Sequence, residues 1–264
     1  MKIISELMAA AIILAGAASC TNGSGLQTQL YSQEESLALV EGKPECLKIK
    51  LDVEYVTGGV KEEVMEPINK VVLECAFGIN YRELATVEEA AQAYVQESYR
   101  LYKEANEIYT ESAEEPAEEG VSDEIYSFST NWELIVNAAF LNPYKDYITY
   151  MVEGYSYQGG AHGMGFKLPV VLDVRTGAQV MESDLFVDGY VEELSRLLTG
   201  NLHDSFEKEE DYESLFTKDI RPNGNFYLTP KGVTYVYSAY EIGPYYLGDI
   251  EVSVSWEELE GLLK

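Results

Sequence analysis

The stretch from residue 47 to residue 56 constrains the fold of this chain more than any other. Apolar and polar side chains alternate there over ten positions, which is the period of a β-strand with one buried face. The pattern stops at a glycine pair, Gly58 and Gly59. Apolar residues at helical spacing follow over 64–75, and Pro67 is compatible with that helix only in its first turn. The chain therefore contains strands and helices in close succession.

The same two periods recur along the rest of the chain. Thr86 and Glu89 have the spacing of a capping box, which predicts the start of the longest helix. Turn-forming residues at 142–146 separate two aromatic-rich strands, as in a β-hairpin, and Asp188 is expected to cap a later helix. The expected strands are 47–56, 126–141, 147–157, 166–174, 226–228, 233–237 and 250–255, and the expected helices are 64–75, 86–109, 191–202 and 256–263. Because strands and helices do not alternate strictly, we expect an α+β fold with mixed or antiparallel sheets and packed helices.

The charge of the chain is unusual for a globular protein. It has 46 acidic residues against 18 lysines and arginines, which gives a formal net charge of −28 at pH 7. Such a field repels phosphate backbones, so binding to nucleic acid is excluded as a function. Twenty-one tyrosines supply amphipathic contact surface of the kind found at protein and sugar interfaces.

The N-terminus has the features of an export signal. Lys2 precedes an apolar run over 7–18, which is shorter than the roughly 20 residues that span a bilayer. Small residues stand directly before Cys20, as in a bacterial lipobox. We therefore expect a lipoprotein signal peptide over 1–19, lipid attachment at Cys20 and a flexible tether over 20–42. An ordinary secretory signal cleaved nearby is the alternative.

Two cysteines remain in the body of the chain, Cys46 and Cys75. In an oxidising compartment they form either a disulfide or a pair of buried free thiols, and the sequence leaves both open. Neither has a histidine nearby in sequence, so a catalytic thiol is not expected.

A glycine-rich turn with one histidine follows the second strand of the expected hairpin. It contains Gly159, Gly160, His162 and Gly163. The glycines allow positive φ angles, and His162 offers one donor and one acceptor. The chain's other histidine, His203, lacks metal-ligand spacing to it, so we expect a structural histidine, no metal site and no cofactor.

Together with two later segments, this turn resembles a known pair of domains. The segments that carry the resemblance are 155–163, 173–177 leading to 184–186, and 225–232 leading to 240–248. In this order they resemble the DUF4163 and DUF3298 domain pair, which forms the extracellular part of RsiV-like anti-sigma factors. The resemblance implies two small consecutive subdomains, a DUF4163-like domain over 43–165 and a DUF3298-like domain over 166–264. In RsiV-like proteins this body binds lysozyme.

The resemblance implies a binding protein without an output domain. The family's sigma-binding segment is not expected here, because only a short leader precedes the body. The first domain also occurs beside a peptidoglycan deacetylase domain. That enzyme needs paired histidines, and the two isolated histidines of this chain do not supply them. We therefore expect a non-enzymatic protein, with no catalytic residues, that is exported and lipid-anchored at the bacterial cell envelope, in the periplasm or on the cell surface. It would capture a basic protein such as lysozyme, or a peptidoglycan fragment.

The expected contacts lie in one aromatic loop. They are Tyr240, Glu241, Pro244, Tyr245 and Tyr246, a composition common in recognition loops. The alternative for this loop is architectural, with Pro244 and Tyr245 shaping a corner of the fold.

Two other functions stay open at the level of sequence. One is an envelope glycan hydrolase that uses a carboxylate pair drawn from the many Asp and Glu residues, which needs a defined separation in a cleft. The other is a purely structural envelope protein, which would bind no soluble ligand.

Overall fold

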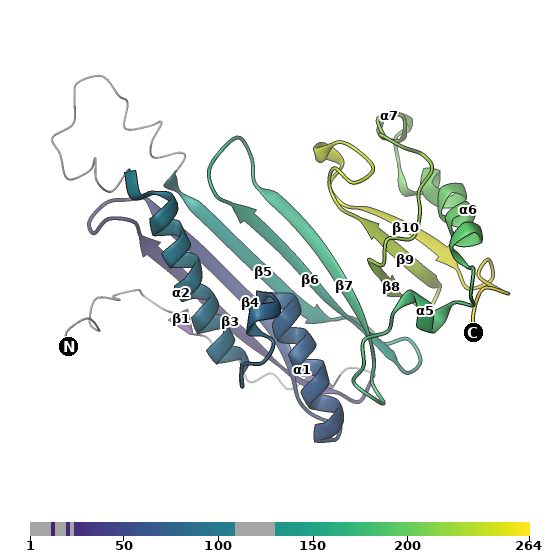
Figure 1. The fold of residues 1–264 in the computed structure, drawn as a ribbon, viewed down its shortest axis with the longest axis horizontal. Helices are drawn as coiled ribbons and strands as arrows, with labels where there is room; N and C mark the ends of the chain where they lie inside the picture. The colour runs from purple at the N-terminus through teal and green to yellow at the C-terminus, as the bar shows by residue number, and fades with distance from the viewer. Residues whose placement is uncertain (1–11, 14–19, 22–23, 109–129) are drawn as a thin grey trace.

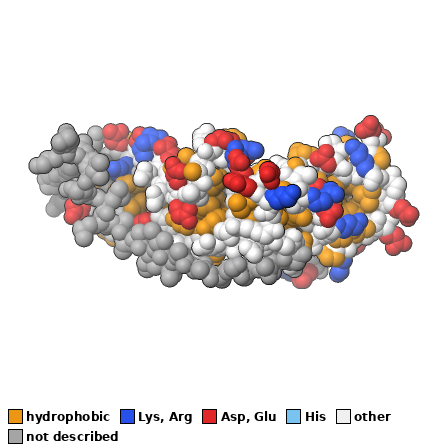
Figure 2. Space-filling view, turned by 90° about the horizontal axis from the view of Figure 1, so that it is seen from below, with side chains coloured by type: hydrophobic (Ala, Val, Ile, Leu, Met, Phe, Trp, Pro, Cys, Tyr) orange, Lys and Arg blue, Asp and Glu red, His pale blue; other side chains and the backbone are white. Residues whose placement is uncertain are grey.

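The computed structural model describes residues 12–13, 20–21, 24–108 and 130–264. Almost all of the expected signal peptide, the side chain of Cys20 and residues 126–129 of an expected strand lie outside this part. Two units follow one another along an elongated molecule, each with its own sheet (Figure 1). On the face shown in Figure 2, acidic side chains occur on both halves of that long axis.

The first unit is a seven-stranded sheet with two helices on one face (Figure 1). Its strands, in spatial order, are β1 (Ile12–Ile13), β3 (Gln27–Ala38), β4 (Cys46–Gly58), β5 (Trp132–Phe140), β6 (Tyr147–Tyr157) and β7 (Met164–Asp173), and β2 (Cys20–Thr21) also pairs with β3. All neighbours are antiparallel except β4 and β5. The parallel pair requires a crossover. The crossover contains α1 (Glu62–Phe77), η1 (Ile79–Tyr81) and α2 (Val87–Ala105).

The first core lies between this sheet and its helices. Alternate residues of β4, including Leu47, Ile49 and Leu51, are fully buried there, as their alternation predicts. The start of α2 is also as predicted, because the Thr86 hydroxyl accepts a hydrogen bond of 3.1 Å from the Glu89 amide.

The second unit packs helices on a small antiparallel sheet. Its strand order is β10 (Ile250–Ser255), β9 (Gly232–Tyr237) and β8 (Phe226–Leu228). The helices are α5 (Glu182–Leu185), α6 (Val191–Asn201), η2 (Leu202–Ser205), α7 (Glu209–Glu213) and η3 (Tyr245–Leu247). The α+β fold with mixed and antiparallel sheets is thereby confirmed. In the described residues no helix is long and apolar enough to cross a membrane.

The expected tether over 20–42 is wrong for most of its length. Residues 27–38 form β3, which pairs with β4 over its whole length. Tyr31 and Leu37 anchor the strand in the core. The pattern was hidden because Gln33 and Glu35 stand at buried positions between them, where an alternating strand normally carries apolar side chains.

The boundary between the units also differs from expectation. A division at 165/166 would cut through β7, whose residues pair with β6 from Met164 to Asp173. The change of sheet comes after Asp173, because the chain turns there and returns alongside Leu172.

Three local predictions are corrected by the structure. Pro67 lies in the second turn of α1, where the carbonyl left without its helical donor belongs to the exposed Glu63. Asp188 does not cap α6, because the N-cap residue is Tyr190, whose side chain makes no capping bond to the helix. Residues 256–263 form turns rather than a helix, because Leu263 forms an antiparallel β-bridge with Phe186.

Candidate functional site

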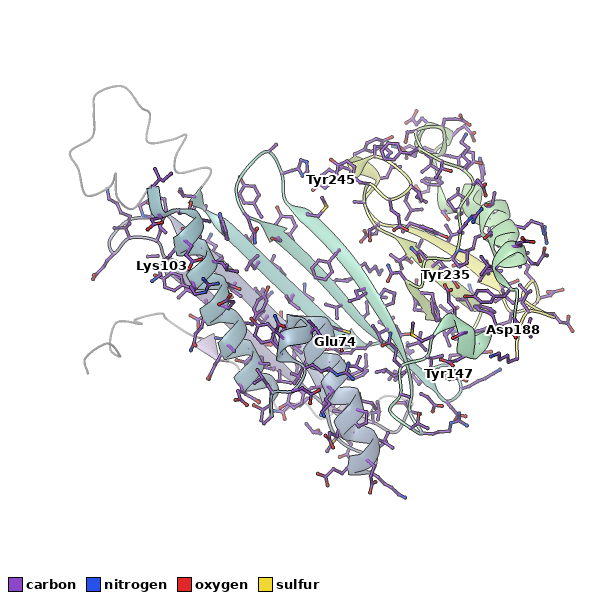
Figure 3. The ribbon with its side chains drawn as sticks, in the orientation of Figure 1. Glu74, Lys103, Tyr147, Asp188, Tyr235 and Tyr245 are labelled. Carbon is purple, nitrogen blue, oxygen red and sulfur yellow. The ribbon has the colours of Figure 1, made fainter. Side chains whose placement is uncertain are left out.

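The two motifs that the sequence analysis singled out meet where the two units join. The ring of His162, from the loop between β6 and β7, lies 4.2 Å from the ring of Tyr245, with 26° between the planes. The Tyr245 hydroxyl donates a 2.7 Å hydrogen bond to the carbonyl oxygen of Gly163. Tyr245 also stacks on Tyr240, with 5.6 Å between ring centroids. Figure 3 shows Tyr245 next to the tip of this hairpin.

Glycines shape the hairpin loop that carries His162. Gly159 and Gly160 have positive φ angles of 85° and 97°, which side chains other than glycine rarely adopt. A Cβ atom on Gly163 would lie 2.3 Å from the ring of Tyr155, so only glycine lets the loop close on that ring. The Nδ1 atom of His162 lies 3.0 Å from the Gly163 carbonyl oxygen. The loop therefore holds the imidazole in a defined position beside Tyr245.

Part of the aromatic loop is architectural. Glu241 accepts hydrogen bonds from the Ser238 amide, at 2.8 Å, and from the Asn223 side chain, at 2.9 Å. Ile242 is buried in the second core, and Pro244 is half-buried directly before η3. Glu241 and Pro244, both expected as ligand contacts, thus hold the loop in shape.

The remaining rings face solvent. Tyr240 and Tyr246 are 49% and 65% exposed, and Tyr240 has a φ of 71°, which is uncommon for a residue other than glycine. Phe216, which the sequence analysis missed, is 62% exposed and donates its amide to the carbonyl of Ile242 at 2.9 Å. The aromatic patch is defined here as His162, Phe216, Tyr240, Tyr245 and Tyr246.

An acidic hollow borders this patch. It has a volume of about 560 Å³ and opens between η2, α7 and the start of β10. Leu247 of η3 forms part of its wall, which connects it to the aromatic loop. Its lining consists of Ser205, Phe206, Glu207, Lys208, Asp211, Leu247, Asp249, Ile250 and Glu251. The lining therefore contains four carboxylates and one lysine.

A half-buried ion pair connects the hollow to the first sheet. Lys167 of β7 lies 2.5 Å from one oxygen of Glu251 and 3.3 Å from Glu153. The other Glu251 oxygen accepts a 2.6 Å bond from Tyr227. Burial alone would raise the pKa of Glu251, but the bonds from Lys167 and Tyr227 outweigh it and lower that pKa. Burial also raises the pKa of Asp249, and neither the Ala239 amide nor Lys167 offsets this.

Both cysteines of the body are free thiols. Cys46 begins β4 and Cys75 lies near the end of α1, where burial raises its pKa to about 12. Cys75 is therefore protonated at neutral pH and a poor nucleophile. Cys20, the expected lipid attachment site, forms part of β2, and its side chain is not described. Within the described ranges, no group of three or more His, Cys, Asp or Glu side chains has the geometry of a metal site.

Comparison with known proteins identifies part of this chain. Residues 183–257 match the model of DUF3298, described as a protein family of unknown function. The match contains the whole lining of the acidic hollow and four of the five aromatic-patch residues, while His162 lies outside it. The chain thus contains a DUF3298 domain, as the resemblance implied. No curated protein matches it.

Two crystal structures of DUF3298 family proteins share its fold. One, from Bacteroides fragilis NCTC 9343, is 22% identical with a TM-score of 0.78, over 92% of this chain and 95% of that one. The other, from Pseudomonas aeruginosa PAO1, is 18% identical with a TM-score of 0.62, over 92% of this chain and 97% of that one. The coverage shows that both units, and not the DUF3298 segment alone, recur together in these proteins.

Proposed function

We propose that this chain is a non-enzymatic binding protein of the bacterial cell envelope that captures a basic protein such as lysozyme. The observation that carries the proposal is the aromatic patch. Three large rings, Phe216, Tyr240 and Tyr246, are about half or more exposed on loops held by hydrogen bonds. Aromatic side chains that project from a well-ordered loop are typical anchors of protein interfaces.

Charge supports a basic partner. The chain carries −28 at pH 7, and the hollow beside the patch contains Glu207, Asp211, Asp249 and Glu251 against Lys208. Complementary potential speeds the encounter with a cationic protein and orients it. Exposed tyrosine and phenylalanine faces also attract lysine and arginine side chains. The chain already shows this contact, because Lys218 lies 4.2 Å from the ring centre of Tyr212.

The envelope location is the second half of the proposal. It rests on the signal-like residues 1–19, the lipobox-like site at Cys20 and the resemblance of the first unit to DUF4163. The lipid would hold the chain at the membrane while the aromatic patch meets its partner. A peptidoglycan fragment is the other ligand of the same surface, and binding of such a fragment instead of a protein is one outcome of the test below.

One observation favours a second function, an envelope glycan hydrolase. Asp249 and Glu251 line the same hollow, and their pKa values are shifted in opposite directions. Such a pair is typical of an acid and a base in one active site. Against it, Lys167 and Tyr227 occupy both oxygens of Glu251. The binding function is therefore the better supported of the two.

Substitutions in the patch test the binding function. Phe216→Ala and Tyr246→Ala each remove an exposed ring, and we expect each to weaken lysozyme binding by roughly tenfold or more, the scale of an interface anchor. Ile79→Ala is the matched control, because Ile79 is 64% exposed and lies in η1 of the first unit. Equal affinities for all three variants on a lysozyme-coated biosensor would contradict the proposal. A peptidoglycan-fragment surface run in parallel distinguishes the two ligands.

A further inference from the structure

A second concave surface lies on the helix side of the first sheet. Figure 1 shows that α1 and α2 lie over the β3 and β4 half of this sheet and leave part of β6 and β7 uncovered. On β7 the uncovered side chains are Met164, Phe166 and Leu168, which are 41%, 40% and 38% exposed. They alternate with Gly165 and Lys167, so all three belong to one face of the strand.

A groove of about 370 Å³ runs between this strand and the helices. Leu134 and Val136 of β5 and Phe166 of β7 line it from the sheet, and Phe77 and Leu101 line it from the helices.

The sheet-side lining is kept flat by a glycine. A Cβ atom on Gly154 would lie 2.2 Å from the ring of Phe166, so that ring covers the position where a neighbouring side chain would stand. Because Gly154 pairs with Phe166 across β6 and β7, the ring lies against the strand instead of projecting from it. The groove therefore keeps a smooth apolar wall next to Leu134 and Val136.

The groove is electrically neutral in a strongly acidic protein. Glu74 is the one charged residue of its lining, and Arg82 already pairs with it. A second copy of this chain also carries a net charge of −28, so the two copies would repel each other. A basic segment would find no free carboxylate in the lining. The surface instead matches an uncharged apolar occupant, because burial of a chain without charges leaves no ion unpaired.

We propose that this groove binds the acyl chain of a neutral lipid. Its volume is more than twice the roughly 150 Å³ that holds one benzene molecule, and it lies in the size range of ligand pockets. The hydroxyl of Ser156 and the amide of Gln158 supply polar contacts for an uncharged headgroup at the hairpin end of the groove. This site lies in the first unit and is independent of the aromatic patch and of the proposed capture of a basic protein.

Tryptophan fluorescence tests the proposal, because Trp132 lines the groove and the chain's other tryptophan, Trp256, stacks on Tyr144 in the second core. The probe is a monoacylglycerol with a brominated acyl chain, added to the full chain below its micelle concentration. Bromine quenches indole fluorescence at contact. We expect saturable quenching that persists in Trp256→Phe and is lost in Trp132→Phe. Absence of quenching, or equal quenching in both variants, would overturn the proposal.

A matched pair of charged variants tests whether the acyl chain of the lipid binds in the groove. Leu101 is 45% exposed at its rim, and Leu30 is 41% exposed on β3, away from it. Both variants keep the cores intact, because neither leucine is buried. We expect Leu101→Asp to raise the dissociation constant for the probe about tenfold or more, since it places a charge in an apolar site. Leu30→Asp should leave it unchanged, and equal effects of the two would contradict the assignment.

Discussion

The phenol ring of Tyr245 stacks on the rings of both His162 and Tyr240, and its hydroxyl is bonded to the hairpin that carries His162. One side chain thus joins two loops that are 82 residues apart in sequence. Because the loops belong to different units, the surface around Tyr245 exists only when both units are folded and docked.

Removal of the Tyr245 hydroxyl should loosen this junction. In Tyr245→Phe the carbonyl of Gly163 loses its 2.7 Å donor, and we expect the free energy of unfolding to fall by about 1 kcal/mol. Tyr245→Ala also loses both ring contacts and should cost more. Urea unfolding followed by circular dichroism measures both, and equal stabilities of the two variants would show that the stack contributes nothing.

The backbone at Tyr240 predicts an unusual order of stabilities. Its φ is 71°. An alanine with this φ lowers the free energy of unfolding by about 1 kcal/mol, whereas a glycine adopts the same φ without this cost. Tyr240→Gly and Tyr240→Ala both lose the ring, so their difference isolates the backbone. We expect the glycine variant to be the more stable by about 1 kcal/mol in urea unfolding. A more stable alanine variant would mean that the loop does not hold this φ in solution.

The bonds to Glu251 predict a pH dependence of stability. Its pKa is lowered in the folded protein, so its stabilising contribution is present above the unfolded-state value, about 4.3, and is lost as the pH falls through the folded-state pKa. Glu251→Gln removes this contribution. We therefore expect the stability difference between wild type and Glu251→Gln to be largest near neutral pH and to shrink below pH 4. A difference that does not change between pH 7 and pH 3 contradicts the lowered pKa.

For Asp249 we expect the opposite pH dependence of stability. Its pKa is raised by burial in the folded protein, so the stabilising contribution of its protonated form is present at low pH and is lost as the pH rises through the folded-state pKa. At pH 7 the ionised group therefore opposes folding. Asp249→Asn keeps an oxygen for the Ala239 amide, which lies 3.3 Å away, and should raise the melting temperature at pH 7. A lower melting temperature would contradict this sign.

The same Asp249→Asn variant separates the two proposed functions. If the hollow were a glycosidase site, loss of this acid would reduce turnover of peptidoglycan by about a hundredfold or more. For a binding surface we expect no turnover in the wild type and a change in lysozyme affinity of severalfold at most. Release of soluble sugar fragments by the wild type but not by the variant would favour the hydrolase.

Local patterns predicted most elements, and long-range contacts explain the failures. The alternation over 47–56 and the Thr86 cap depend on neighbours within a few residues, and both are confirmed. Strand β3 was missed because its buried positions include Glu35 and Gln33. These side chains are held in place by bonding to each other and to Tyr31, at 2.9 and 2.6 Å, which no local pattern reveals.

The candidate site was predicted only in part for the same reason. Tyr245 and the His162 turn were both singled out, yet nothing in the sequence showed that the two are in contact. Phe216 was missed because it lies in a different segment of the sequence from the aromatic loop, and its backbone bond to Ile242 brings it there. The role of Glu241 in capping its own loop was also not predicted, because carboxylates that cap a turn and carboxylates that contact a ligand look alike in sequence.

Calorimetric titration of the chain with lysozyme, at physiological salt and at severalfold higher salt, tests the central claim most directly. Salt screens the non-specific attraction between an acidic and a basic protein, whereas contacts made by aromatic rings that become buried at an interface persist at high salt. The account predicts saturable one-to-one binding at both salt concentrations. Absence of binding, or binding that disappears at the higher salt, would contradict it.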